Sequence, residues 1–158
     1  MTPLSVNIYS WNPAMSITFT PNGGDVLMCD FGPDPAEPGT YPLASGPVSV
    51  TPEMIKRRQV VVLAANHQMI MVAPFSTVHP PKMRNFHMHI TADTYPFFAP
   101  GADNWLKADL TMAVSRDRLD RVYFGNKYQR AALSAAHLKA CRICVLHGLA
   151  LGALAPYL

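Results

Sequence analysis

Two neighbouring stretches of sequence predict the central strands: Glu53-Met-Ile-Lys-Arg-Arg-Gln-Val-Val-Val-Leu63 and Met69-Ile-Met-Val-Ala-Pro-Phe-Ser-Thr77. Residues 58–65 and 68–75 are nearly continuous runs of β-branched or apolar residues, which predict two strands. The dipeptide between them, Asn66-His67, is short enough for a hairpin. Paired side by side, the strands would bring a cationic cluster and two hydroxyls together, a set of groups suited to holding a phosphodiester.

The rest of the chain predicts more short strands around this hairpin. We expect strands over residues 25–31, 86–90, 105–110 and 121–124 from their apolar content and their flanking turn residues. In the second of these, alternation places Phe86, Met88 and Ile90 inward and His87 and His89 outward.

One helix is expected at the end of the chain. Ser134 is a suitable N-cap, and Gly152 stands near the expected end. Five or six short strands with one terminal helix predict a mainly β protein, built as a small, closed and strongly bent sheet that the helix covers. The residues that recur at helical spacing are Leu138, Cys141, Val145 and Leu149.

Length and composition bound the class of protein. The 158 residues predict one domain over 23–152, with an irregular leader over 1–22 and a tail over 153–158. A hydrophobic content of 49% with 15% charged residues excludes disorder of the whole chain. The net charge of +3 permits a polyanion partner without requiring one.

The cysteines and the apolar C-terminal segment predict the cellular location of the protein. Three cysteines, an odd and small number, suit a reducing cytoplasm better than a disulfide framework. The apolar segment 143–158 is shorter than the roughly 20 residues that a membrane span needs. We therefore expect a cytoplasmic protein without a membrane partner.

No metal or cofactor is expected. His87 and His89 present two imidazoles without an evident third ligand, and one straight helix cannot wrap four ligands around zinc. Phosphate-binding glycine motifs are absent from the sequence. The proline-rich stretch 32–52 is instead a candidate recognition or lid loop. The four helix residues excluded as zinc ligands are His137, Cys141, Cys144 and His147.

Several ordered motifs resemble the MazF/PemK toxins. They are Gly24-Asp25-Val26 before an apolar strand, Lys56-Arg57-Arg58 leading into Val-Val-Val-Leu, and Val72-Ala-Pro-Phe-Ser-Thr77. Trp105-Leu-Lys-Ala-Asp109 followed by Ala113-Val-Ser-Arg-Asp-Arg-Leu-Asp-Arg121 is similar to a PemK-like branch of that family. The resemblance runs from about Gly23 to about Gly152.

The resemblance implies a fold and an activity. The fold would be a small SH3-like barrel with a C-terminal helix, as in MazF, PemK and CcdB, and the protein would be a homodimer. The activity would be metal-independent, sequence-selective cleavage of single-stranded RNA, neutralised by an antitoxin protein. The family's catalytic positions map onto Arg58, Ser76, Lys107 and Asp109.

Each of these side chains has a role in RNA cleavage by 2′-hydroxyl attack. Arg58 and Ser76 would stabilise the phosphate, because a guanidinium fork and a hydroxyl donate to its oxygens. Asp109 would act as general base, and Lys107 would assist the leaving group or bind phosphate. Further RNA contacts are expected from Lys56, Arg57, Thr77, His79, Lys82 and Arg84.

The residues alone leave simpler interpretations open. In one of them, Arg57 and Arg58 only begin a strand, with their guanidinium groups in solvent. In the other, Lys107 and Asp109 form an exposed ion pair that contributes little to stability. Strand alternation also puts the two arginines on opposite faces, so at most one is expected to be catalytic.

Two departures from the family pattern keep a second function in view. Gln59 stands where the family has proline after the arginine, and Lys107 stands where close relatives have arginine. The alternative is a barrel that cuts nothing and binds a protein, as the CcdB-type relatives do, or binds RNA.

Overall fold

Two paired strands, β2 (Arg57–Asn66) and β3 (Met69–Ser76), form the centre of the sheet. The computed structural model describes residues 16–32, 56–66 and 68–158. β2 and β3 run antiparallel with Asn66 opposite Met69 and Val60 opposite Pro74, which confirms the predicted hairpin. A register shift between Val62 and Ala64 marks a bulge that bends the pair.

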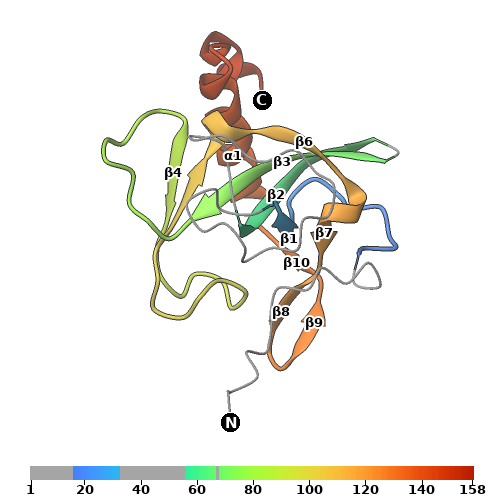
Figure 1. The fold of residues 1–158 in the computed structure, drawn as a ribbon. Helices are drawn as coiled ribbons and strands as arrows, with labels where there is room; N and C mark the ends of the chain where they lie inside the picture. Colours follow the sequence, from blue (N-terminus) through green and yellow to red (C-terminus); the bar gives the residue numbers. More distant parts are fainter. Residues whose placement is uncertain (1–15, 33–55, 67) are drawn as a thin grey trace.

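The neighbouring strands extend the sheet on both sides (Figure 1). β1 (Asp25–Asp30) pairs with β2, and its other edge carries β10 (Ala131–Ala132) and then β7 (Leu119–Asp120). The free edge of β3 carries β6 (Met112–Ser115) along its first half and β5 (Asn104–Lys107) along its second. β4 (His87–Ile90) pairs with β5.

A separate hairpin, β8 (Val122–Phe124) and β9 (Lys127–Gln129), projects from the sheet (Figure 1). The sequence predicted β8 but not its partner. β6, β7 and β10 were also not predicted as strands, because runs of two to four residues are too short to show a period.

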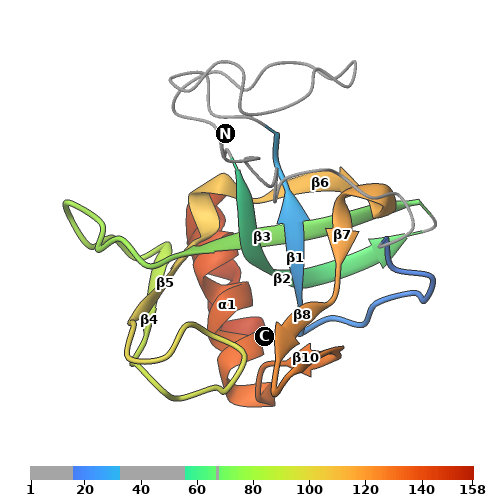
Figure 2. The same cartoon turned by 60° about the horizontal axis from the view of Figure 1, so that its bottom comes forward.

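The central part of the sheet is buried on both faces, which explains the continuous apolar runs of β2 and β3. Val61 and Ala73 belong to the core that lies between the sheet and the helix α1 (Ala135–Gly148). Val60, Val62 and Ile70 belong to a second core on the opposite face. Because successive side chains alternate between faces, every residue of the run 60–62 must be apolar. Figure 2 shows α1 lying across one face of the sheet.

Alternation also holds in β4. Ile90 is a member of the core under α1, and Phe86 and Met88 pack against that core, as predicted. His89 is exposed. His87 is half-buried, so the prediction of an outward His87 holds only in part.

The helix begins as predicted and ends earlier. The Ser134 hydroxyl accepts a hydrogen bond from the backbone N–H of His137 at 3.2 Å, which confirms the N-cap. Ala150 takes a left-handed conformation with φ 60°, and its N–H donates to the His147 carbonyl. Leu151 N–H donates to the Leu146 carbonyl at 2.6 Å, which completes a Schellman motif. The helix therefore stops at Gly148, and Leu149 is 57% exposed.

The helix cysteines pack as apolar groups. Cys141 and Cys144 are both buried in the core between α1 and the sheet. Burial raises the pKa of the Cys141 thiol to about 12, so this thiol stays protonated and unreactive near neutral pH. Among the described residues, no helix is long and apolar enough to cross a membrane.

Two expectations about the sheet are wrong. The strand path runs from β10 to β4 without a pairing between those two ends in the described residues, so the predicted closed barrel is an open, bent sheet. The strand expected over 105–110 ends at Lys107, and Ala108–Leu110 forms a 3-10 turn. That turn packs closely on α1, because a Cβ added at Gly148 would lie 3.0 Å from the Ala108 carbonyl oxygen.

The ends of the predicted proline-rich loop meet at the start of β2. The Lys56 N–H donates to the Gly32 carbonyl at 2.7 Å, and the Phe31 N–H donates to the Lys56 carbonyl at 3.0 Å. Residues 33–52 of that loop lie outside the described residues, as does the leader up to residue 15. In the rest of the leader, Ile17 is 3% exposed and joins the second core.

The packing under α1 predicts the effect of a core truncation. Leu106 is fully buried there, so Leu106→Ala should lower the free energy of unfolding by about 2–5 kcal/mol. Met83→Ala, at a position that is 43% exposed, should change it by less than about 0.5 kcal/mol. Chemical denaturation of both variants measures the difference. Equal losses would contradict the placement of Leu106.

Candidate functional site

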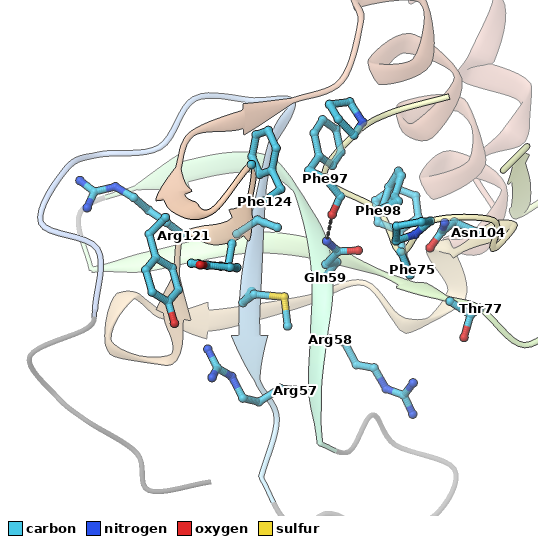
Figure 3. Close-up of a pocket in the computed structure, with 18 of the residues that line it drawn as sticks. Arg57, Arg58, Gln59, Phe75, Thr77, Phe97, Phe98, Asn104, Arg121 and Phe124 are labelled. Atoms are coloured by element: carbon cyan, nitrogen blue, oxygen red, sulfur yellow. Dashed lines mark hydrogen bonds between the residues drawn. The ribbon is translucent and has the colours of Figure 1, made fainter. Parts of the chain in front are cut away.

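A cavity of about 630 Å³ opens where β2 begins and β3 ends. Its other walls come from the loop 96–100 and from the β8–β9 hairpin (Figure 3). The residues that line it are Met28, Arg57, Arg58, Gln59, Phe75, Ser76, Thr77, Pro96, Phe97, Phe98, Ala99, Pro100, Asn104, Arg121, Val122, Tyr123, Phe124, Gly125 and Tyr128. Four of the ten predicted site residues therefore meet here: Arg57, Arg58, Ser76 and Thr77.

The two arginines leave β2 in opposite directions, as strand alternation predicts (Figure 3). In the pairing with β1, Arg57 lies opposite Asp30 and Arg58 opposite Cys29. The Arg57 guanidinium forms an ion pair with the Asp120 carboxylate, with Nη2 and Oδ2 3.5 Å apart. Because Asp120 belongs to β7, this contact ties the start of β2 to the strand that leads into the hairpin.

The two hydroxyls differ in burial. Ser76 ends β3, is 7% exposed, and lies opposite Trp105 of β5. Its Oγ accepts a hydrogen bond from the Val78 backbone N–H at 3.1 Å. Accepting this bond uses a lone pair of Oγ and leaves the hydroxyl proton for another acceptor. Thr77 follows β3 and is exposed.

The lining is positively charged. It contains Arg57, Arg58 and Arg121, and none of the described residues that line it is an aspartate or a glutamate. The Arg121 guanidinium lies over the Phe19 ring, 5.2 Å from its centroid. A concave surface lined by one sign of charge attracts the opposite charge. The cavity therefore favours an anionic ligand.

Aromatic side chains form the opposite wall. The Phe98 ring packs edge-on against Phe75, with centroids 5.0 Å apart, and Phe97 packs against Phe98 at the same distance. The side-chain amide of Gln59 donates a hydrogen bond to the Phe97 carbonyl (Figure 3). Gln59 thus fastens the loop to β2. No sequence pattern predicts this role, apart from an amide at the position where the family has proline.

The predicted pair Lys107 and Asp109 lies outside the cavity lining. Lys107 ends β5, whereas exposed Asp109 belongs to the following 3-10 turn, so the two do not share a strand face. Both charges act on His87, which lies opposite Lys107 in the sheet. Sequence spacing misled here because the chain leaves the extended conformation at Ala108.

The remaining four predicted RNA contacts also lie outside the cavity lining. Lys56 precedes β2 with a left-handed backbone, at φ 65°. The ring of exposed His79 packs edge-on against Trp105 at 5.1 Å, and Trp105 pairs with Ser76. The other two, Lys82 and Arg84, are exposed between β3 and β4.

The Gln59 contact gives a testable prediction. Gln59→Ala removes the hydrogen bond to Phe97, so backbone amides of the loop 92–103 should exchange with deuterium faster than in the wild type. Amides of α1 should be unaffected. Gln129→Ala is a matched control, because Gln129 donates a comparable bond to the Phe124 carbonyl within the hairpin. Unchanged exchange of the loop in Gln59→Ala would contradict the fastening role.

The surroundings of His87 give a second prediction, about pH. Burial holds the pKa of His87 below its ordinary value, the Lys107 and Arg84 charges lower it further, and the Asp109 carboxylate raises it. The Arg84 N–H donates to His87 Nδ1 at 3.1 Å, which also favours the neutral ring. Because the folded pKa is depressed, the stability from neutral His87 is present above about pH 6.5 and is lost as pH falls through the folded pKa.

An NMR titration of the His87 ring tests this arrangement. Asp109→Asn should lower the pKa of His87 further, since it removes the cause that raises it, and Lys107→Gln should raise that pKa. A His87 pKa that does not respond to Asp109→Asn would show that the carboxylate lies elsewhere.

Comparison with known proteins places the chain in a family. A family model described as the PemK-like, MazF-like toxin of type II toxin–antitoxin systems matches residues 22–145. The uncharacterized protein YifN of Escherichia coli (strain K12) is 38% identical over 122 residues, covering 68% of this chain and 76% of YifN. An uncharacterized protein of Haemophilus influenzae (strain ATCC 51907 / DSM 11121 / KW20 / Rd) is 34% identical over 109 residues, covering 65% and 71%.

A solved structure shows the same fold. It is an endoribonuclease in complex with its cognate antitoxin from Mycobacterial species, which is 14% identical and superposes with a TM-score of 0.50. The match covers 83% of this chain and 96% of that one. Together with the family match over most of the chain, it supports one conclusion: the chain belongs to the PemK-like, MazF-like toxins of type II toxin–antitoxin systems.

Proposed function

We propose that this protein is a metal-independent endoribonuclease that cleaves single-stranded RNA at selected sequences. The observation that carries the proposal is the cavity in which Arg57 and Arg58 of β2 meet Ser76 and Thr77 at the end of β3. Guanidinium and hydroxyl groups are donors that match phosphate oxygens, and the described lining holds no carboxylate to repel them.

The chemistry is an attack of RNA on its own backbone. The 2′-hydroxyl loses a proton, its oxygen bonds to the adjacent phosphorus, and the bond from phosphorus to the 5′-oxygen breaks. The products are a 2′,3′-cyclic phosphate and a 5′-hydroxyl that has gained a proton. Arg58 and the Ser76 hydroxyl stabilise the extra charge of the pentavalent phosphorus species. Arg57, held by Asp120, binds a neighbouring phosphate.

Two proton transfers complete the reaction. Asp109 as general base and Lys107 as the group that assists the leaving oxygen stay predictions, because both lie outside the cavity lining. His79 is a second proton carrier, since its ring packs on the Trp105 that pairs with Ser76. We assign Lys56, Thr77, Lys82 and Arg84 to binding of the RNA backbone beyond the scissile phosphate.

Two protein partners belong to the proposal. A cognate antitoxin would occupy the arginine-lined cavity and so exclude RNA, acting with the toxin in the cytoplasm. A second copy of the chain would pack on the end of the sheet remote from the cavity, where β3 begins, and on the segment after α1. Support for the dimer comes from large apolar side chains that are exposed there: Met69, Met71, Met112, Leu149, Leu151 and Leu154.

Cleavage of a long single-stranded RNA by purified protein in EDTA tests the function. The wild type should give fragments with 5′-hydroxyl ends, and Arg58→Ala should lower the rate by about 10²–10³-fold. Lys139→Ala, an exposed change on α1, is the matched loss of a cation and should leave the rate unchanged.

The outcomes separate the two candidate functions. No cleavage of several varied RNAs by the wild type would favour a binding module without catalysis. Equal cleavage by wild type and Arg58→Ala would remove Arg58 from the catalytic group. In the same assay, an Asp109→Asn variant that cuts at the wild-type rate would exclude Asp109 as the base and leave His79 to be tested.

A further inference from the structure

The β8–β9 hairpin carries two large aromatic side chains that the protein core does not use. Tyr123 and Tyr128 are directly opposite each other in the hairpin, and their ring centroids lie 5.0 Å apart in an edge-to-face arrangement. Tyr123 is 57% exposed and Tyr128 is 49% exposed, although both line the cavity. Such exposed rings gathered at a concave site mark a binding surface.

The hairpin is built to hold these rings in place. Its two turn residues, Gly125 and Asn126, have left-handed backbones with φ 57° and 63°, which is the geometry of a tight type I′ turn. The Gln129 side-chain amide donates to the Phe124 carbonyl at 2.8 Å, across the base of the turn. The two tyrosines therefore project from a short hairpin whose turn is held by a side-chain hydrogen bond.

The body of the protein anchors that element on two sides. Val122 is 2% exposed, and the Phe124 ring packs edge-on against Phe97 with centroids 5.9 Å apart. Just after β9, the Arg130 guanidinium forms an ion pair with buried Asp25 at 2.8 Å. Because Gln59 holds Phe97 to β2, the hairpin and the phosphate-binding residues belong to one connected structure.

We propose that Tyr123 and Tyr128 form a nucleobase-stacking platform that holds unpaired bases of single-stranded RNA beside the phosphate held by Arg57 and Arg58. This inference rests on the proposed function and names a base-binding element of the same site. Unpaired bases offer flat faces to aromatic rings, whereas bases in a duplex are already stacked and paired.

Charge and ring chemistry together favour RNA over a protein ligand. Arg57 and Arg58 in the lining complement a phosphate backbone. The exposed tyrosine faces complement bases, and each phenolic hydroxyl adds a donor and an acceptor for the edge of a base. An acidic peptide would use the arginines but would leave both aromatic faces without a matching surface.

Binding of short single-stranded oligonucleotides that cannot be cleaved tests the platform. The probe is a fluorescein-labelled 2′-O-methyl RNA of random sequence, compared with an abasic oligomer of the same length and charge. The wild-type protein should bind the base-bearing probe more tightly than the abasic one. The Tyr123→Ala/Tyr128→Ala double variant should lose about tenfold to a hundredfold in affinity for the base-bearing probe, and little for the abasic one.

Two control variants separate stacking from a loss of structure. The Tyr123→Phe/Tyr128→Phe variant keeps both rings and should bind within a few-fold of the wild type, because stacking depends on the π-face and not on the hydroxyl. Lys139→Ala changes an exposed residue of α1 that does not line the cavity, and should have no effect. An unchanged affinity of the double alanine variant, or an equal loss in the phenylalanine variant, would overturn the stacking platform.

The binding readout keeps this inference apart from the nuclease proposal. Tyrosine-dependent binding by a wild-type protein that does not cut would support the platform and overturn the nuclease. A wild type that cuts, with an unchanged affinity of the double alanine variant for the base-bearing probe, would overturn the platform alone. Loss of antitoxin binding with unchanged RNA binding would make the hairpin a protein-docking element and would also overturn it.

Discussion

The antiparallel pairing of β2 with β3 is the constraint on which the rest of the structure depends. The middle of β2 and the second half of β3 are buried on both faces, so their side chains build the core under α1 and the second core at the same time. The hydrophobic burial that stabilises the fold therefore also sets the register, because a slip of one residue would move every side chain to the wrong core. That register brings the arginines at the start of β2 to the hydroxyls at the end of β3.

The cavity depends on contacts made far from those strand ends. Arg57 is held by Asp120 from β7, and the aromatic loop is held by Gln59 from β2. The Phe97 ring in turn contacts Phe124 of the hairpin, so the aromatic loop also holds the hairpin in place. Each of these contacts joins segments distant in sequence, so the shape of the site is a property of the whole chain.

Sequence reasoning succeeded where the pattern is long or the chemistry is local. The apolar runs of β2 and β3 and the Ser134 cap were predicted because a continuous strand and an N-cap hydroxyl carry their own signal. It failed to predict that the strand ends at Lys107 and that the sheet, in the part of the chain that the structure describes, does not close. The helix end was misplaced because Ala150, and not a glycine, takes the left-handed position.

The amino-acid sequence alone was enough to predict the mainly β class, the central hairpin, the terminal helix and the pairing of arginines with hydroxyls. These follow from side-chain alternation and capping, which act over a few neighbouring residues. Three placements could be seen only in the folded protein. Gln59 holds the aromatic loop, and the charges of Lys107 and Asp109 act on His87. Tyr123 and Tyr128 line the cavity. The physical reason is that these placements depend on packing and hydrogen bonds between distant segments, which no local spacing encodes.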